Sequence, residues 1–184
     1  VSNYLRKKGK LAKDTVVATV MSNLGLHKYA RDNGLELVQT KVGDRYVLEE
    51  MLKDGYNLGG EQSGHVILLD YNPTGDGILT SLMLIQAILE ENETASKMAE
   101  IIKLYPQVLI NAKVNSDKKY DYDKDDEIKS AIEKLEKEFA GNGRVLIRPS
   151  GTEPLVRVMI EGEDQEYITK KAKEIANLIE EKLK

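Results

Sequence analysis

The sequence contains no cysteine, and it has no long uninterrupted hydrophobic run. Without cysteine, the chain can form neither disulfide bridges nor thiolate metal sites, and it is compatible with a reducing cytoplasm. The most apolar stretch, residues 78–88, is interrupted by Thr80, Ser81 and Gln86 and is too short to span a bilayer. No signal peptide is recognisable at the start. We therefore expect a cytoplasmic protein.

Strong charge of either sign is also lacking, because 27 basic and 31 acidic residues leave a net charge of −4. This mild acidity argues against a nucleic-acid or membrane partner, although a local basic pocket is compatible with it. Hydrophobic residues make up 41% of the chain and charged residues 32%, which is typical of globular proteins. A length of 184 residues suits one large domain or two small ones.

Strand and helix patterns alternate in the first half of the chain. β-branched and apolar runs predict strands at residues 15–20, 35–40 and 65–70. Helices are expected after Asn23, after Asp44 as N-cap, from about 78 to 90 and from 95 to 103. This alternation predicts an α/β domain over residues 1–104, with a three-layer arrangement of helices around a mixed sheet.

The pattern changes after residue 104, close to Pro106. Strands are expected at residues 108–114, 143–148 and 155–161, with helices at 128–139 and from about 164 to the end. This β-α-β-β-α order predicts a small α+β domain over residues 105–184, with an antiparallel sheet and two helices.

The first candidate site is the loop Gly60-Glu61-Gln62-Ser63-Gly64-His65. Glu61 and Ser63 point the same way in an extended segment and can bind the hydroxyl groups of a sugar. A serine-type turn with a solvated Glu61 is an equally good interpretation of these residues. A nucleophilic Ser63–His65 pair is disfavoured, since neither a third member nor an oxyanion-hole motif is evident.

Further residues in and near this loop carry open alternatives. His65 can transfer protons near neutral pH, or it can simply begin a strand with its ring bonded to the backbone. Gly43, Asp44 and Arg45 open a helix whose N-terminus favours anions, so Arg45 is a candidate for facing a phosphate. An N-cap followed by a solvated arginine explains the same residues equally well.

The second candidate site is Arg148-Pro149-Ser150-Gly151-Thr152-Glu153-Pro154, with Arg157 shortly after it. Backbone amides near Gly151 can form an anion-binding nest, and Ser150 and Thr152 add hydroxyl donors. Arg148 and Arg157 offer guanidinium groups suited to phosphate. A plain hairpin turn also favours such residues, but the two arginines favour phosphate binding.

A metal site is not expected in this chain. Asp121, Asp123 and Asp125 imitate the start of a calcium loop, but Asp126 stands where that loop needs glycine and Ile132 where it needs glutamate. This acidic run is therefore interpreted as solvated charge.

Several motifs together resemble the α-D-phosphohexomutases. They are Thr-Val-Met-Ser-Asn-Leu-Gly-Leu at 19–26, Val-Gly-Asp-Arg-Tyr-Val-Leu-Glu at 42–49, Gly-Gly-Glu-Gln-Ser-Gly-His at 59–65, Thr-Gly-Asp-Gly at 74–77 and Arg-Pro-Ser-Gly-Thr-Glu-Pro-Leu-Val-Arg at 148–157. The resemblance covers essentially the whole chain and is strongest to the branch acting on glucosamine phosphate. It implies the third and fourth of four domains, the fourth being of the TATA-box-protein-like type.

The resemblance also implies roles for residues in the first loop. By similarity, Glu61 and Ser63 bind sugar hydroxyls, and His65 lies near the reacting centre as a possible acid or base. Gly43, Asp44 and Arg45 correspond to a loop that faces the active site.

In the second loop the resemblance implies a phosphate site. By similarity, Arg148, Ser150, Gly151, Thr152 and Arg157 hold the phosphate that is not being transferred.

Two motifs of the family do not occur in the sequence: a phosphoserine followed by His-Asn, and the aspartate loop that binds Mg²⁺. Because the chain starts at Val1, within an expected helix, we expect a fragment whose missing N-terminal domains carry both motifs. The fragment alone is expected to be inactive, and a homodimer of the full-length protein is compatible with the resemblance. Branches acting on glucose or mannose phosphates, and a non-catalytic sugar-phosphate binding module, remain alternatives.

Overall fold

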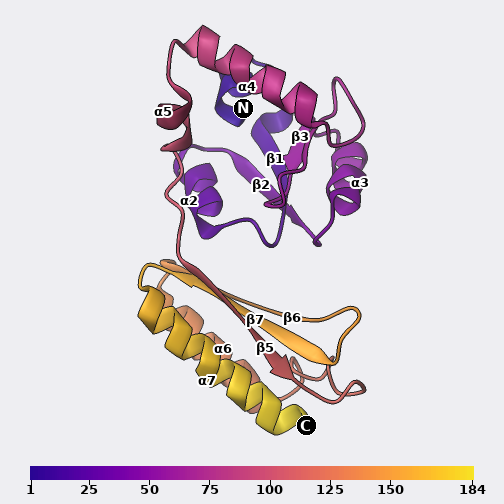
Figure 1. Cartoon of the computed structure of the whole chain (residues 1–184), viewed down its shortest axis with the longest axis vertical. Coiled ribbons are helices and arrows are strands. Elements are labelled where there is room, and N and C mark those ends of the chain that lie inside the picture. The colour runs from indigo at the N-terminus through magenta and orange to yellow at the C-terminus, as the bar shows by residue number, and fades with distance from the viewer. The chain divides into compact units, whose positions relative to one another are not determined.

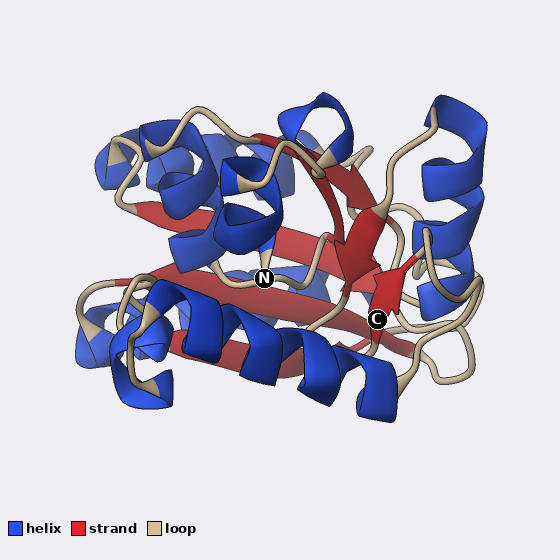
Figure 2. Ribbon diagram, turned by 90° about the horizontal axis from the view of Figure 1, so that it is seen from above, coloured by secondary structure: helices blue, strands red, loops and turns tan.

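A computed structural model describes residues 1–184 and divides them into two units, Val1–Leu104 and Tyr105–Lys184 (Figure 1). Both units combine a sheet with helices, and Figure 2 shows the helices in blue and the strands in red. No helix in the structure has both the length and the apolar character needed to cross a bilayer.

The sheet of the first unit is mixed and has the strand order β2-β1-β3-β4. β1 (Thr15–Thr19) pairs in parallel with β2 (Glu36–Thr40) and with β3 (Leu58–Gly60). β3 pairs antiparallel with β4 (Val66–Leu68). The sequence patterns missed β3 because its three residues include Gly59 and Gly60, which have low strand propensity.

Helices cover both faces of this sheet, as the α/β prediction requires. They are α1 (Ser2–Lys7), a 3₁₀ turn (Ala12–Asp14), α2 (Leu24–Asp32), α3 (Asp44–Asp54), α4 (Gly77–Glu91) and α5 (Ala95–Ala99). Val17 packs with Val47 and Met51 of α3 on one face of β1. The partly buried Val16 packs on the other face, in the cluster that includes residues of α1, α2 and α4. The three-layer arrangement is therefore confirmed.

Two details of these helices differ from expectation. The N-cap of α3 is Gly43 and not Asp44, which is the first helical residue and accepts the N–H of Arg45. Leu52, which stands four residues after Leu48 and by this spacing shares its apolar stripe on α3, is 61% exposed. The outer face of α4 is also apolar and exposed, at Ile78, Leu82, Ile85 and Leu89.

The second unit follows the predicted β-α-β-β-α order. Its antiparallel sheet has the order β5-β7-β6, formed by β5 (Gln107–Lys113), β6 (Gly143–Pro149) and β7 (Leu155–Gly162). Two helices, α6 (Asp126–Phe139) and α7 (Gln165–Leu183), belong to the same unit.

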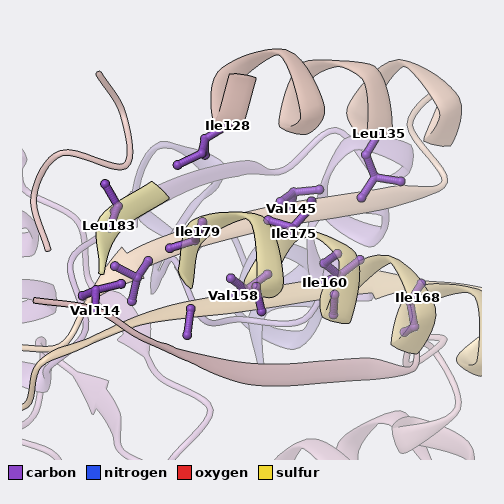
Figure 3. Packing of buried hydrophobic residues seen from close by; sticks show 14 residues of the cluster. Val114, Ile128, Leu135, Val145, Val158, Ile160, Ile168, Ile175, Ile179 and Leu183 are labelled. Carbon is purple, nitrogen blue, oxygen red and sulfur yellow. The ribbon is translucent and has the colours of Figure 1, made fainter. Parts of the chain in front are cut away.

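The core of the second unit lies between its sheet and its two helices. Val158 and Ile160 of β7 pack with Ile175 and Ile179 of α7 and with Ile128 of α6 (Figure 3). Because side chains alternate along a strand, the odd-numbered residues of β7 point to the face of the sheet away from these helices. Arg157 belongs to that second face.

Candidate functional site

Two backbone hydrogen bonds hold the first loop, which connects β3 to β4. The Glu61 N–H donates to the His65 carbonyl at 3.0 Å, and the Gly64 N–H donates to the Glu61 carbonyl at 3.1 Å. Gly64 has φ of 99°, a conformation that side-chain-bearing residues rarely adopt. The sequence pattern places His65 at the start of a strand, but β4 begins at Val66 and His65 lies in the loop.

The side chains of Glu61, Ser63 and His65 form one hydrogen-bonded network. The Ser63 hydroxyl donates to Glu61 Oε1 at 2.7 Å, and Ser63 Oγ lies 2.9 Å from His65 Nδ1. His65 Nδ1 also lies 3.2 Å from Glu61 Oε1. Since the single hydroxyl proton goes to the carboxylate, Ser63 Oγ accepts from Nδ1, which therefore carries a proton. The other ring nitrogen, Nε2, is left for contact with a ligand.

This geometry does not match a nucleophilic triad. A triad needs one imidazole nitrogen on the serine and the other on the carboxylate. In the structure Nδ1 faces both Ser63 and Glu61, so the ring cannot relay a proton from one to the other. The arrangement instead orients a carboxylate, a hydroxyl and an imidazole on one loop, which suits hydrogen bonding to a polyhydroxylated ligand.

Glu61 also joins this loop to the start of α3. Its second oxygen, Oε2, accepts the Gly43 N–H at 3.2 Å, across 18 residues of sequence. The Glu61 side chain is only 11% exposed, whereas that of His65 is 56% exposed. Glu61 is thus held from two sides, and Gly43 is placed against it.

Asp44 and Arg45 do not join this network. The Arg45 Nε pairs with Glu49 Oε1 of its own helix at 2.7 Å, and the arginine side chain is 81% exposed. The Asp44 carboxylate accepts the Arg45 N–H at 2.8 Å. The structure therefore brings Gly43 to the loop and leaves the two side chains that follow it facing solvent.

A cavity of about 320 Å³ borders Glu61 and Gln62, with apolar walls from β1 and β3. Its volume is at the lower end of the range of small-molecule pockets. Ser63 and His65 do not line it. Glu61 is therefore the member of the network that faces this cavity.

The second loop connects β6 and β7 and is closed at its base by Ser150. The Ser150 N–H donates to the Leu155 carbonyl at 2.8 Å, and Ser150 Oγ accepts the Glu153 N–H at 3.3 Å. Ser150 is only 2% exposed. Its side chain therefore shapes the turn by accepting the Glu153 N–H.

Arg148 and Arg157 lie directly opposite each other on the two strands. Opposite residues of an antiparallel pair share a face, so the two guanidinium groups are neighbours. Burial, and then the charge of Arg157, lower the pKa of Arg148. Arg157 Nε has no hydrogen-bond partner, and Nη2 makes only a 3.4 Å contact with Glu153. The two neighbouring cations therefore have little compensating negative charge within the chain.

The tip of the same loop presents open backbone donors. Gly151 and Thr152 are exposed, and their N–H groups have no hydrogen-bond partner in the chain. A Cβ on Gly151 would meet nothing within 4 Å. Open backbone amides and guanidinium groups are the kinds of donor that phosphate-binding sites use.

Two contacts in these sites could not be found from the sequence. One joins Gly43 to Glu61, and the other joins Lys119 Nζ to the Ser150 carbonyl at 2.8 Å. Lys119 lies in the polar run 115–127, in which each charged residue on its own predicts only solvation.

Models of known families match both units of the chain. Phosphoglucomutase/phosphomannomutase, alpha/beta/alpha domain III, matches residues 1–105, and the C-terminal domain of the same family matches residues 109–178. The chain belongs to the phosphoglucomutase/phosphomannomutase family.

Curated relatives of the present chain are named phosphoglucosamine mutase. The protein from Ruminiclostridium cellulolyticum is 58% identical over 98% of the chain, and that from Caldicellulosiruptor bescii is 59% identical over 100% of it. The chain spans 40% and 41% of the length of these two relatives.

Solved structures support the family fold. An N-acetylphosphoglucosamine mutase from Aspergillus fumigatus matches 98% of the present chain with a TM-score of 0.76 at 20% identity, and the match covers 41% of the mutase chain. A putative phosphomannomutase from Thermus thermophilus matches 97% of the present chain with a TM-score of 0.59 at 21% identity, and the match covers 39% of the phosphomannomutase chain.

The side chains of the present chain do not form a metal site. No group of three or more histidine and acidic side chains is placed to hold a metal ion. One solved structure of the A. fumigatus enzyme is a complex with GlcNAc-6P and magnesium. The carboxylates of the present chain do not fit such an ion.

Proposed function

We propose that the whole protein is a phosphoglucosamine mutase, which interconverts glucosamine 6-phosphate and glucosamine 1-phosphate. The observation that carries this proposal is the facing pair Arg148 and Arg157 beside the open amides of Gly151 and Thr152. Such a site suits the phosphate of a phosphosugar that is held while the other end reacts. The names of the relatives favour glucosamine phosphate among the family's substrates.

In this proposal the first loop recognises the sugar. Glu61 and Ser63 bind hydroxyl groups of the ring, since a carboxylate accepts and a hydroxyl both donates and accepts. Gly43 and Asp44 help to shape this side of the site, because the Gly43 N–H already holds Glu61 in place.

His65 is proposed as an acid or base near the reacting oxygen. Its Nδ1 is bonded to Ser63 and lies 3.2 Å from Glu61 Oε1, so any proton transfer uses Nε2. Arg45 has a weaker case for contact with the substrate, because its guanidinium pairs with Glu49.

In the second loop, Arg148 and Arg157 contribute charge, and Ser150, Gly151 and Thr152 contribute hydroxyl and amide donors. These groups hold the phosphate that is not transferred. Phosphoryl transfer depends mainly on positioning and charge stabilisation, so a fixed phosphate anchor is a large part of what the protein must provide.

The transfer itself is assigned to parts of the whole protein outside this chain. A phosphoserine there would donate its phosphoryl group to glucosamine 6-phosphate and give the 1,6-bisphosphate. After the intermediate turns over in the site, its other phosphate returns to the serine and glucosamine 1-phosphate leaves. Mg²⁺ would stabilise the charge on the transferred group and would be bound by those other parts, since no group of side chains in this chain fits it.

The test compares Glu61→Gln with Glu49→Gln in the full-length enzyme. In this proposal Glu61 binds the sugar, whereas Glu49 pairs with Arg45 on the surface of α3. Loss of hydrogen bonds from a charged group should lower kcat/KM by about 10- to 100-fold for Glu61→Gln. The control should stay close to wild type. Near-normal kinetics of Glu61→Gln would place sugar recognition elsewhere.

Substrate choice and catalysis are tested separately. The full-length enzyme should prefer glucosamine 6-phosphate to glucose 6-phosphate and mannose 6-phosphate. A preference for either of the others would move it to another branch of the family. The 184-residue chain alone should show no turnover in a coupled mutase assay. Absence of turnover in the full-length protein as well would favour a non-catalytic sugar-phosphate binding module.

A further inference from the structure

Lys119 contacts the second loop from a distant part of the sequence. It lies between β5 and α6 and donates from Nζ to the Ser150 carbonyl at 2.8 Å, across 31 residues. The lysine is half-buried and has no carboxylate partner. Its ammonium lies 5.2 Å from the centre of the Tyr120 ring and donates its hydrogen bond to one backbone carbonyl at the base of the loop.

This contact determines the orientation of one peptide group. In a planar trans peptide the C=O and the following N–H point to opposite sides, and the chain has no cis peptide bond. Holding the Ser150 carbonyl toward Lys119 therefore turns the Gly151 N–H the other way, to the side that Lys119 does not occupy. Glycine has no Cβ to restrict this peptide, and nothing else in the chain bonds to the Gly151 N–H.

We propose that Lys119 is a positioning residue of the phosphate loop, holding the Ser150–Gly151 peptide so that the Gly151 N–H is presented to the phosphate. This inference rests on the proposed phosphate-binding function of the loop. The ammonium also polarises the peptide it contacts, which makes the Gly151 N–H a stronger donor. Lys119 itself does not touch the ligand.

The test is an NMR titration of the ¹⁵N-labelled 184-residue chain with inorganic phosphate. In the wild type, phosphate should shift the Gly151 and Thr152 amide signals. Lys119→Met should weaken phosphate binding by about 3- to 10-fold, as expected for one hydrogen bond, and should reduce the Gly151 shift. Lys119→Arg should restore both, because it keeps a cationic donor.

Lys118→Met is the matched control. Lys118 donates from Nζ to a main-chain oxygen of Lys184, the last residue, at 2.9 Å, so it also contacts the main chain from the same segment but away from the loop. It should leave the phosphate affinity unchanged, and so separate positioning of Gly151 from general loosening of the segment.

Three results would overturn the inference. Unchanged affinity and an unchanged Gly151 shift in Lys119→Met would refute it and leave the proposed function standing. Equal weakening by Lys118→Met would reduce Lys119 to a structural tether. Absence of any phosphate-induced shift in the wild type would refute the phosphate loop itself, and the inference with it.

Discussion

Replacing Arg157 by glutamine should change the stability of the chain in opposite directions with and without phosphate. Arg157 lies opposite Arg148, and its charge contributes to the lowered pKa of Arg148 after burial. Like charges directly opposite in a sheet destabilise by roughly 0.2–1 kcal/mol. The 3.4 Å contact of Arg157 with the exposed Glu153 offsets little of this. Without phosphate, Arg157→Gln should therefore raise the free energy of unfolding by about 0.2–1 kcal/mol.

Phosphate should reverse this order. A ligand at about 100 times its Kd stabilises the native state by about 2.7 kcal/mol. Hydrogen bonds to a charged group contribute about 1.5–3 kcal/mol, so loss of Arg157 should remove most of that stabilisation. In phosphate the wild type should be more stable than Arg157→Gln, whereas in phosphate-free buffer it should be less stable.

The measurement is urea denaturation followed by circular dichroism at low ionic strength, with hydrogen exchange of β7 amides to report on the second unit. Arg144→Gln is the matched control in the same sheet. Its partner Glu161 is fully buried and lies 2.8 Å from the guanidinium. The free energy of unfolding of Arg144→Gln should therefore fall by about 3–5 kcal/mol in either buffer. Either of two results would refute this prediction. One is that Arg157→Gln, like Arg144→Gln, is less stable than the wild type without phosphate. The other is that phosphate stabilises Arg157→Gln as much as it stabilises the wild type.

Three further predictions concern the first unit. Gly59→Ala should lower the free energy of unfolding by about 1–3 kcal/mol, because the new Cβ would lie 2.5 Å from Met51 Sδ in a packed core. Asp76→Ala should cost about 1 kcal/mol, since its carboxylate accepts two N–H groups at the start of α4. The hydrogen bond from Lys8 is the largest of the effects that lower the pKa of Glu90 to about 2. The ionised Glu90 therefore contributes its full stabilisation at pH values above 4.5, the ordinary pKa of this group. That contribution is lost as pH falls from 4.5 toward 2, and Glu90→Gln should lose less stability over that interval than the wild type.

Each of these has a measurement that can contradict it. Urea denaturation showing Gly59→Ala as stable as the wild type would mean that Met51 moves aside without cost. An unchanged stability of Asp76→Ala would mean that water caps α4 equally well. Parallel acid-unfolding curves for the wild type and Glu90→Gln would show that Lys8 does not discriminate between charged and neutral Glu90.

Much of the fold follows from patterns within short stretches of sequence. Asn23 is expected to cap the helix after it, and in the structure its side chain accepts the Gly25 N–H. Asp76 likewise caps α4. The two loops could be recognised as candidate sites because each concentrates polar side chains beside glycine. β3 could not be predicted, since Gly59 and Gly60 are ordered as a strand only by pairing with β1 and β4.

Local sequence patterns were sufficient for the helices, most of the strands and the residue types in both loops. These features depend on hydrogen bonds and periodicities that act over a few residues. Folding of the whole chain was needed to place Gly43 against Glu61, Arg157 opposite Arg148 and Lys119 on the Ser150 carbonyl. Such contacts depend on strand order and register, which are set by burying the whole core, and no local pattern encodes them.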